Sequence, residues 1–360
     1  MASFVQVFDD VTKLGRKIPT TDYAERGAYP IIDQGQDEIA GYTDETEGLF
    51  EDVPAIIFGD HTRVIKYVDT PCFLGADGVK LLKAKIPDAN YRYLYYVLQN
   101  ARIPNTGYNR HFKWLKEVEI PLPDARTQSD IVAALDKVTA LIALRKQQIA
   151  KLDELVKARF VEMFGDPVSN QKKWPLFALG SRCELITGNT PSRAESENYG
   201  DFIEWIKSDN INTPNTYLTT AQEGLSEIGY KKGRSVEAGS ILMTCIAGSI
   251  SCIGNVAIAD RKVAFNQQIN AIVPKQDEVL FLYWLMLLAK PIIHSPINMS
   301  LKGILSKGQL SEMKFPIPPL DLQHQFAAFV AQTDQQKLTI QHSLAQLELL
   351  KKALMQKYFG

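Results

Sequence analysis

The last segment of this chain repeats its middle segment without a gap. Ile120-Pro121-Leu122-Pro123 recurs as Phe315-Pro316-Ile317-Pro318, and Phe164-Gly165 recurs at the same offset as Phe359-Gly360. Each copy predicts a proline-rich exit from a globular region into a long helix that ends at glycine. A chain that alternates globule, helix, globule and helix has two similar halves, which suggests a target in two parts.

Both repeated segments carry a narrow apolar stripe in steps of three and four residues, which is typical of a helix that packs against another helix. Arg145, Lys337 and Lys351 interrupt the stripes, so we expect each helix to pair with the other rather than to form a free-standing homodimer. An ordinary hairpin or an oligomerisation element is the alternative. The predicted helix–helix and partner interface comprises Ile131, Leu135, Val138, Ile142, Ile149, Leu152, Phe326, Val330, Ile340, Leu344 and Leu347.

Length and composition limit the class of protein. A chain of 360 residues suits two domains of about 130 to 150 residues each plus connecting helices. A helix of about 35 residues is roughly 50 Å long and can hold two domains at a fixed distance. The apolar run at residues 279–289 is too short to span a bilayer, and no basic-then-apolar signal region opens the chain, so we expect a cytoplasmic protein.

Charge and cysteine content also narrow the possibilities. The net charge of −1 shows no excess of basic residues, whereas a non-specific DNA binder normally has one. Any DNA must therefore bind at local patches, such as the basic and aromatic residues 102–116. The cysteines show neither CxxC pairing nor a suitable His spacing, which argues against zinc and predicts reduced structural thiols. These cysteines are Cys72, Cys183, Cys245 and Cys252.

The repeat continues more faintly into the globular parts, where Tyr93-Leu94-Tyr95-Tyr96 matches Phe281-Leu282-Tyr283-Trp284. Short β-rich runs bounded by Gly and Pro alternate with one clear helix per domain, which predicts an α+β fold with a curved or barrel-like β-sheet. We therefore predict two similar domains separated by two long antiparallel coiled-coil helices, with a pseudo-two-fold internal repeat. The predicted boundaries are 1–125 for the first domain, 126–165 for the central helix, 166–319 for the second domain and 320–360 for a C-terminal helix that packs on the central helix.

This layout resembles the specificity subunits of type I restriction-modification systems, in which two target-recognition domains alternate with two repeated helical regions. The resemblance covers nearly the whole chain and rests on the order, spacing and duplication of its motifs. Besides the two proline-rich exits, these are Ile186-Thr187-Gly188-Asn189-Thr190-Pro191-Ser192, Trp205-Ile206-Lys207-Ser208, Tyr29-Pro30-Ile31-Ile32 and Gly41-Tyr42-Thr43-Asp44. One departure is that the chain begins almost directly in the first domain, so we expect the C-terminal helix to return to that domain's side.

The resemblance implies a DNA-binding protein that performs no chemistry itself. Each domain would read one half of a gapped double-stranded DNA site, and the helices would set the gap and dock two methyltransferase subunits. Those partners would transfer a methyl group from S-adenosylmethionine to adenine N6 after flipping the base out of the stack. Restriction subunits that use ATP and Mg could add translocation and cutting.

The sequence motifs expected of an enzyme do not occur. We find no GxxxxGK[ST] loop for ATP and no convincing GxGxxG after a strand. An adenine methyltransferase of this type would need an Asn-Pro-Pro-aromatic tetrad, and Ile317-Pro318-Pro319-Leu320 lacks its polar and aromatic ends. A coiled-coil scaffold or regulator without sequence-specific DNA binding is the second hypothesis. An enzyme in its own right is the third.

Base readout in the major groove needs forked donors and acceptors on loops, with Arg and Lys favouring guanine and Asn and Gln favouring adenine. Polar loop segments of this kind occur in both domains, and a solvated or structural turn is the alternative for each. In the first domain the candidate DNA-binding residues are His61, Thr62, Arg63, Asn105, Thr106, Tyr108, Asn109, Arg110, His111 and Lys113. In the second domain they are Asn189, Thr190, Ser192, Arg193, Lys207, Ser208, Ser249, Ser251, Asn266, Gln267, Gln268, Ser300, Lys302 and Lys307.

Two further patterns have competing interpretations. The stripe Tyr91, Tyr93, Tyr95 and Tyr96 resembles a stacking platform for single strands, but its match with the apolar second-domain helix favours a core role. Gln128 and Gln323 recur at the start of the two long helices. They could bond to neighbouring backbone or to a partner subunit.

Overall fold

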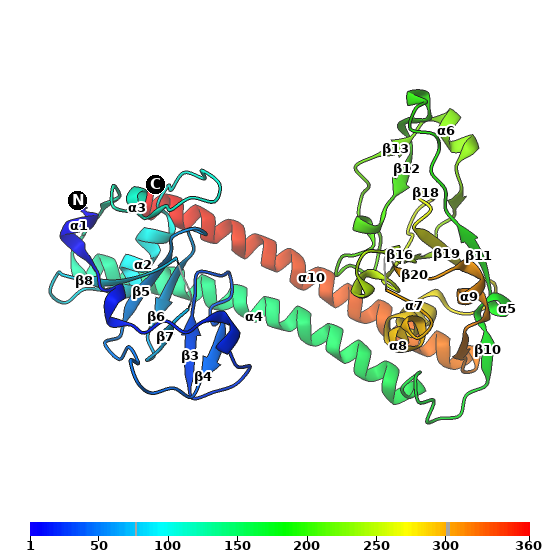
Figure 1. The fold of residues 1–360 in the computed structure, drawn as a ribbon, viewed down its shortest axis with the longest axis horizontal. Coiled ribbons are helices and arrows are strands. Elements are labelled where there is room, and N and C mark those ends of the chain that lie inside the picture. Colours follow the sequence, from blue (N-terminus) through cyan, green and yellow to red (C-terminus); the bar gives the residue numbers. More distant parts are fainter. Residues whose placement is uncertain (76–77, 300–302) are drawn as a thin grey trace. The chain divides into compact units, whose positions relative to one another are not determined.

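The chain forms two compact units, each of which includes part of both long helices. The computed structural model describes residues 1–75, 78–299 and 303–360. Unit 1 comprises Met1–Gln147 and Gln341–Gly360, and unit 2 comprises Gln148–Ile340. The two 40-residue helices, α4 (Ala125–Phe164) and α10 (Leu320–Phe359), are therefore divided between the units (Figure 1).

Unit 1 contains a four-stranded antiparallel sheet, a three-stranded mixed sheet and a two-stranded pair. The four-stranded sheet contains, in order, β2 (Phe8–Asp10), β8 (Val79–Ala84), β5 (Ala55–Gly59) and β6 (Ile65–Val68). The three-stranded sheet contains β4 (Gly41–Thr43), β3 (Tyr29–Ile32) and β7 (Phe73–Leu74). The pair consists of β1 (Ala2–Ser3) and β9 (Glu119–Ile120). The helices are α1 (Phe4–Val7), α2 (Tyr91–Gln99) and α3 (Phe112–Leu115), with 3₁₀ turns at Thr12–Leu14 and Thr20–Asp22.

Unit 2 contains two four-stranded sheets and two two-stranded pairs. The first four-stranded sheet contains, in order, β11 (Cys183–Thr187), β19 (Ile269–Pro274), β15 (Ile241–Thr244) and β17 (Val256–Ile258). The second contains β13 (Gly224–Leu225), β12 (Tyr199–Ile206), β18 (Val263–Phe265) and β14 (Ser235–Val236). The two pairs are β10 (Leu176–Ala178) with β21 (Lys314–Pro316), and β16 (Ile246–Ala247) with β20 (Gly303–Ile304). The helices are α5 (Leu179–Arg182), α6 (Glu227–Lys232), α7 (Val279–Leu288), α8 (Lys290–His294) and α9 (Lys307–Glu312), with 3₁₀ turns at Ser196–Asn198, Ser208–Asn210 and Ile250–Cys252.

The two units share one topology, as the sequence repeat predicts. The order β2-β8-β5-β6 in unit 1 corresponds to β11-β19-β15-β17 in unit 2, and β4-β3-β7 corresponds to β13-β12-β18. Even the parallel pairing of β3 with β7 recurs as the parallel pairing of β12 with β18. The predicted α+β fold with an internal repeat is therefore confirmed. The pair of β16 with β20 has no counterpart among the described residues of unit 1.

The aromatic stripe of α2 lies in the core of unit 1. The Asn90 side chain caps this helix by accepting the Tyr93 backbone N–H at 3.0 Å. Tyr93 and Tyr96 are 1% and 0% exposed, and the Tyr93 hydroxyl donates to the Pro121 carbonyl at 2.9 Å. Their burial raises the pKa of both phenols to about 12. The core interpretation of the stripe is correct, and these two rings are not available to stack on nucleic-acid bases.

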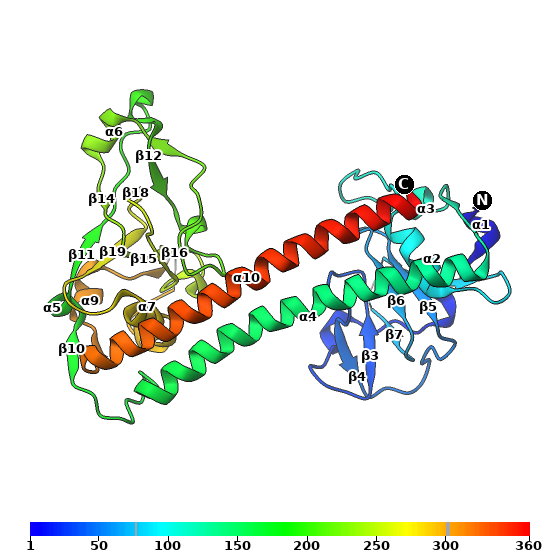
Figure 2. The ribbon, with the colours of Figure 1, turned by 180° about the vertical axis from the view of Figure 1, so that it is seen from behind.

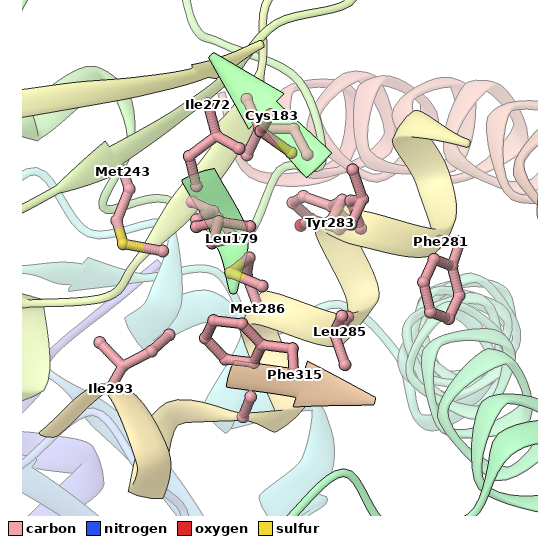
Figure 3. Packing of buried hydrophobic residues seen from close by; sticks show 14 of the residues in the cluster. Leu179, Cys183, Met243, Ile272, Phe281, Tyr283, Leu285, Met286, Ile293 and Phe315 are labelled. Atoms are coloured by element: carbon pink, nitrogen blue, oxygen red, sulfur yellow. The ribbon is translucent and has the colours of Figure 1, made fainter. Parts of the chain in front are cut away.

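The apolar helix α7 is the centre of the main core of unit 2. Its Phe281, Leu282, Leu285 and Met286 are at most 1% exposed and belong to a cluster formed by strands, α7 and the two long helices. Figure 3 shows side chains of this cluster converging on α7, with Met286 close to Phe315. Burying a side chain of this size contributes about 1.5 to 3 kcal/mol. This helix is buried on most of its surface, which explains its apolar sequence.

Helix α4 begins and ends at residues that suit helix termini. The Asp124 carboxylate accepts the Thr127 backbone N–H at 2.9 Å, which satisfies one of the free donors of the first turn. Gly165 follows the helix with a φ of 78°, in the left-handed region where a side chain is unfavourable. The Trp174 indole N–H then donates to the Phe164 carbonyl at 2.9 Å and satisfies one of the free acceptors of the last turn.

The repeated glutamines bond to backbone in both units. Gln128 Nε2 donates to the Pro123 carbonyl at 2.8 Å, and Gln323 Nε2 donates to the Pro318 carbonyl at 2.9 Å. Gln323 is fully buried and also contacts Asp277 and the Glu278 backbone N–H. Of the two alternatives for these glutamines, the structure shows the backbone bond at both positions.

The long helices pack against each other in an antiparallel direction, as predicted. In unit 2, Asp153 of α4 contacts Lys337 of α10 at 2.6 Å, whereas the Phe160 and Phe326 rings lie 5.4 Å apart. In unit 1, Lys146 Nζ lies 3.4 Å from Glu348 Oε1. Figure 2 shows the two helices from the side opposite to that of Figure 1. The seam positions in the sequence are all buried or half-buried; they are Ile131, Leu135, Val138, Ile142, Ile149, Leu152, Phe326, Val330, Ile340, Leu344 and Leu347.

The cysteines are separate thiols. Cys72, Cys183 and Cys245 are buried, and burial raises the pKa of each to about 12. Within the described residues, no group of three or more His, Cys, Asp or Glu side chains is placed to hold a metal ion. None of the helices in these residues is long and apolar enough to cross a membrane.

Candidate nucleic-acid interface

In unit 1 the structure joins the two segments that were predicted to contact DNA. Asp60, at the end of β5, is 3% exposed, and its side chain accepts the Phe112 backbone N–H at 2.7 Å. Its carbonyl accepts the His111 backbone N–H at 2.8 Å. These bonds attach the 105–111 loop to the 60–63 turn. Asp60 was not singled out in the sequence, because an Asp after a strand is common in turns.

An exposed aromatic stack lies where these two segments meet. The rings of His61 and Tyr108 are stacked with centroids 4.6 Å apart and an angle of 6° between their planes. His61 Nδ1 also lies 3.2 Å from the Asn109 carbonyl. Tyr108 is nevertheless 87% exposed, and Gly107 beside it has a φ of 77° with open space around it. A large ring that is held in place but exposed is available to a ligand.

The remaining first-domain candidates differ in how exposed their side chains are and in how firmly neighbours hold them. Thr62 and Arg63 are held by their neighbours: the Thr62 hydroxyl donates to the Gln34 carbonyl at 2.6 Å, and the Arg63 guanidinium donates to the Ile103 carbonyl at 3.4 Å. The backbone of Arg63 is left-handed, with a φ of 64°. The candidates with exposed side chains are Thr62, Asn105, Thr106, Tyr108, Asn109, Arg110 and Lys113.

His111 requires a correction. It is completely buried, with Nδ1 3.0 Å from the Asp60 carbonyl and Nε2 3.4 Å from the Thr106 hydroxyl. A side chain that is shielded on all sides cannot touch DNA without rearrangement, so the prediction of a DNA contact was wrong for His111. Its role is to hold the loop.

In unit 2 the structure brings together three predicted segments at the ends of β11, β12 and β18. The Gly188 backbone N–H donates to the Ile269 carbonyl at 3.0 Å, and the Asn189 backbone N–H donates to the Phe265 carbonyl at 3.1 Å. A Cβ on Gly188 would lie 2.1 Å from the Asn266 carbonyl oxygen, so only glycine permits this approach. The Thr190 hydroxyl donates to the Gln267 side chain. The three segments, 188–193, 207–208 and 266–268, therefore form one polar surface, which we name the amide surface.

Two cations at the edge of the amide surface share a carboxylate. Arg193 Nη2 lies 2.7 Å and Lys207 Nζ 2.9 Å from the same oxygen of Glu223. Hydrogen bonds from Lys207 and Arg193 lower the pKa of the Glu223 carboxyl. Both cations also lie over the Trp205 ring, at 5.1 and 5.4 Å from its centroid. Glu223 was missed in the sequence because it lies in a loop distant from both cations.

Other second-domain candidates lie away from this surface or need a new role. Asn266 is 7% exposed, so it supports its neighbours rather than presenting its own amide, and the prediction of a direct DNA contact was wrong for it. Ser249 and Ser251 bond to each other at 2.8 Å in an exposed turn after β16. Lys307 begins α9 and borders a depression with Lys275, beyond the opposite end of β19 from Gln268. Ser192 is exposed, whereas Ser300 and Lys302 lie outside the described residues.

Comparison with known proteins gives a consistent result. The family described as "Type I restriction modification DNA specificity domain" matches residues 6–154 and again residues 171–349. The specificity subunit of the type I restriction enzyme EcoR124I/EcoR124II of Escherichia coli is 24% identical over 284 residues, which cover 72% of this chain and 67% of the relative. The HindI specificity subunit of Haemophilus influenzae is 32% identical over 157 residues, which cover 41% of this chain but only 33% of the relative.

Two solved structures share the fold. The S subunit of a type I restriction-modification system from M. genitalium gives a TM-score of 0.60 at 18% identity, and the match covers 99% of this chain and 95% of that one. A chain from a study of complex assembly and conformational transition of the type I R-M system gives a TM-score of 0.58 at 17% identity, with 99% and 95% covered. At these identities the likeness applies to the fold alone.

Proposed function

The chain belongs to the type I restriction-modification DNA specificity family and is a specificity subunit of such a system, and from this premise we propose that each unit reads one half of a two-part DNA site. The observation that carries the proposal is the duplicated fold, with polar loops beyond the ends of strands in both units, although at different positions of the repeat. In unit 1 they follow β5 and precede α3; in unit 2 they follow β11, β12 and β18. Two similar readers in one chain suit a bipartite site.

The exposed side chains of these loops suit recognition in the major groove. Unit 1 offers the exposed Tyr108, Asn109 and Arg110 on one loop, and unit 2 offers the exposed Gln267 and the half-buried Gln268 on another. Hydrogen bonds from such groups distinguish base edges, whereas the cations position the protein on phosphates. The overall charge of −1 provides little non-specific attraction, so affinity in this proposal depends on local contacts and on the partner subunits.

The chemistry belongs to partner subunits in this proposal. Two methyltransferase subunits would use S-adenosylmethionine to methylate adenine N6, and restriction subunits, where present, would use ATP and Mg. The long helices offer docking positions, because several of their apolar side chains are unusually exposed. Leu144 and Leu155 of α4 are 54% and 49% exposed, and Leu338 and Leu349 of α10 are 59% and 69% exposed. We propose these leucines as contacts of a docked partner, because burial in an interface would remove their apolar surface from water.

A domain exchange tests the proposal. Replacing residues 168–313 with the matching part of a relative that has a different target should change one half of the methylated DNA motif and leave the other half intact. Genome-wide mapping of methylated adenine, in the native host with and without the gene, gives both motifs. A change in both halves, or no motif that depends on this gene, would overturn the proposal.

The helices provide a second test. We propose that they set the gap between the two half-sites. Deleting one heptad from each helix removes about 10 Å of helix, because each residue contributes about 1.5 Å. The gap in the methylated motif should then shorten by about three base pairs, at 3.4 Å per base pair. An unchanged gap in an active deletion variant contradicts the spacing role.

A further inference from the structure

We propose that Gln268 specifies one base of the second half-site by presenting only hydrogen-bond donors to the DNA. This inference rests on the proposed function and adds a residue and the chemical group that it recognises. Gln268 follows β18 and precedes β19, in the middle of the amide surface. What Gln268 can recognise depends on how its side-chain amide is oriented.

The neighbouring Asn266 sets that orientation. Asn266 is 7% exposed, and its Oδ1 accepts the Gln268 backbone N–H at 3.0 Å. A backbone N–H can only donate, so the Asn266 oxygen must face it and the Asn266 NH₂ group must face the other way. Asn266 Nδ2 then points at the Gln268 side chain, 3.4 Å from Oε1. The identity of both atoms in the Asn266 amide is fixed by the hydrogen-bond network.

The donor on Asn266 in turn fixes the amide of Gln268. An NH₂ group needs an acceptor, so the Gln268 oxygen faces inward, where the Ser208 hydroxyl also donates to it at 3.3 Å. Both contacts are to the same oxygen. The Gln268 NH₂ group has no hydrogen-bond partner in residues 1–75, 78–299 and 303–360, and the residue is half-buried rather than enclosed. Two N–H bonds are therefore presented outward.

The backbone around Gln268 is held as firmly as its side chain. The Gln268 carbonyl accepts the backbone N–H groups of Cys245 and Ile246, at 2.8 and 3.2 Å. The Asn266 backbone N–H donates to the Ile206 carbonyl at 3.1 Å. A side chain fixed in this way loses little entropy on binding, which makes it an effective reader.

The outward donors select a class of base. In the major groove, guanine presents two acceptors, O6 and N7, thymine presents O4, and adenine pairs its N7 acceptor with a donor on N6. Glutamine usually reads adenine by accepting from N6 and donating to N7, and this requires its oxygen to face outward. With that oxygen engaged by Asn266 and Ser208, Gln268 favours guanine or thymine and disfavours the donor groups of adenine and cytosine.

Reversing the outward group tests this assignment. Gln268→Glu keeps the shape and both inward bonds but turns the outward donor into an acceptor. Gln268→Lys keeps an outward donor. Gln276→Glu is the matched control, because it makes the same change of charge at an exposed position beyond the other end of β19. Each variant replaces the natural gene in the host, and the methylated motif is mapped.

In the expected result, the natural chain and Q276E produce the same methylated motif. Its second half-site contains guanine or thymine at one position on the strand that Gln268 reads. Q268E changes the preference at that position by on the order of tenfold towards adenine or cytosine, and Q268K retains it. Loss of all methylation in Q268E counts as support if the purified variant unfolds at the temperature of the natural chain and Q268K remains active. An unaltered motif in Q268E overturns the inference while leaving the proposed function intact.

Loss of methylation in both Q268E and Q268K, together with lowered unfolding temperatures, also overturns the inference, because Gln268 would then be structural. A motif that is absent from the natural strain, or independent of the gene, overturns the proposed function itself.

Discussion

In both units the two long helices meet a helix of the domain, α2 in unit 1 and α7 in unit 2. The side chains at this junction differ between the units. In unit 2, Phe160 and Phe164 of α4 meet Phe281 of α7 and Phe326 of α10. The Phe160 and Phe281 rings are stacked with centroids 5.7 Å apart, and Phe164 contacts Phe281 edge-on at 5.0 Å. All four are at most 4% exposed. Aromatic pairs in such geometry contribute about 0.5 to 1.5 kcal/mol beyond the burial of their area.

The repeat places Met355, Phe359, Tyr93 and Ile131 at the matching positions of unit 1. Tyr93 and Phe359 keep the edge contact, with centroids 5.7 Å apart, but Met355 and Phe359 are only half-buried. The Asn100 side chain donates to the Phe359 carbonyl at 3.2 Å, which holds the end of α10 by a polar bond as well. The same fold thus accommodates a densely packed aromatic junction in unit 2 and a looser junction of aromatic and aliphatic side chains in unit 1. This is possible because the two units share the helix positions but not the side-chain volumes.

The recognition loops differ more than the scaffold does. Unit 1 presents an exposed aromatic stack, whereas unit 2 presents a network of amides and hydroxyls. The loop between β7 and β8 contains two glycines, Gly75 and Gly78, where unit 2 has Asn266, Gln267 and Gln268. The comparison shows that the strands and helices keep their positions in both units, whereas the loops beyond the strand ends carry different side chains; in the proposed function, these loops determine which bases are read.

The largest effect is expected at the aromatic junction. Phe160→Ala should destabilise unit 2 by about 3 to 5 kcal/mol, because it removes a buried ring and leaves a cavity. The matching Met355→Ala should cost about 1 to 2 kcal/mol, because Met355 is already half-exposed and the site can admit water. Urea unfolding followed by circular dichroism measures both. Equal costs would show that the two junctions are equally well packed.

The repeated glutamines give the next comparison. Gln323→Ala should cost about 1 to 3 kcal/mol, because Asp277 and the Glu278 backbone N–H lose a buried partner. Gln128→Ala should cost about 0.5 to 1.5 kcal/mol, because it loses only the bond to the Pro123 carbonyl. Since both variants lose the equivalent proline bond, the difference between the two unfolding midpoints isolates the Asp277 and Glu278 contacts. A larger cost for Q128A than for Q323A would show that these two contacts do not stabilise unit 2.

The exposed stack of unit 1 should matter for DNA but not for stability. Tyr108→Ala is expected to change the unfolding free energy by no more than about 0.5 kcal/mol, because the ring is 87% exposed. It should weaken binding to the target by on the order of tenfold, with discrimination lost only in the first half-site. Tyr108→Phe is the control, because it retains the ring over His61. Fluorescence anisotropy with oligonucleotides altered in one half at a time separates the two halves. Equal loss in both halves would exclude a local role.

The smallest effect is expected from carboxylates that pair with surface cations. Among the described residues, Glu223 pairs with two cations, Arg193 and Lys207, whereas Glu45 of unit 1 pairs with one, Arg16, at 3.1 Å. Because hydrogen bonds from Lys207 and Arg193 lower its pKa, Glu223 stays charged at neutral pH and its pairing is lost only as the pH falls through that lowered value. Glu223→Gln should therefore steepen the dependence of log K on log salt by up to about 1.8, and Glu45→Gln by up to about 0.9. Identical slopes would mean that these cations do not meet phosphates.

Sequence reasoning succeeded where a pattern has only one stable arrangement. The apolar run at 279–289 had to be buried, and α7 is buried. Helices α4 and α10 end at Phe164 and Phe359, directly before the two glycines of the repeat. The stripe on residues 91–96 was ambiguous by itself, and only its match with the second half identified it as core.

Sequence reasoning failed where neighbours distant in the chain decide the role of a polar side chain. His111 and Asn266 have residue types that suit DNA contacts, yet both are buried: His111 lies against the Asp60 carbonyl of another segment, and the Asn266 side chain bonds to the Gln268 backbone within its own loop. Glu223 and Asp60 gave no signal, because their importance comes from partners that the fold brings to them. No local pattern records such contacts.

The sequence by itself determined that this chain has two similar α+β halves and two long helices, because apolar periodicity, proline exits and terminal glycines act over short distances along the chain. Its duplicated motifs also indicated a specificity subunit. The tertiary structure decided which polar side chains face outward, which are buried as supports and which way the amide of Gln268 points. These outcomes depend on hydrogen bonds that the fold completes, such as those between His111 and Asp60 and between Ser208 and Gln268, and on how neighbouring loops bury the groups involved. An amide or imidazole can serve either as a contact or as a support until the fold supplies its partners.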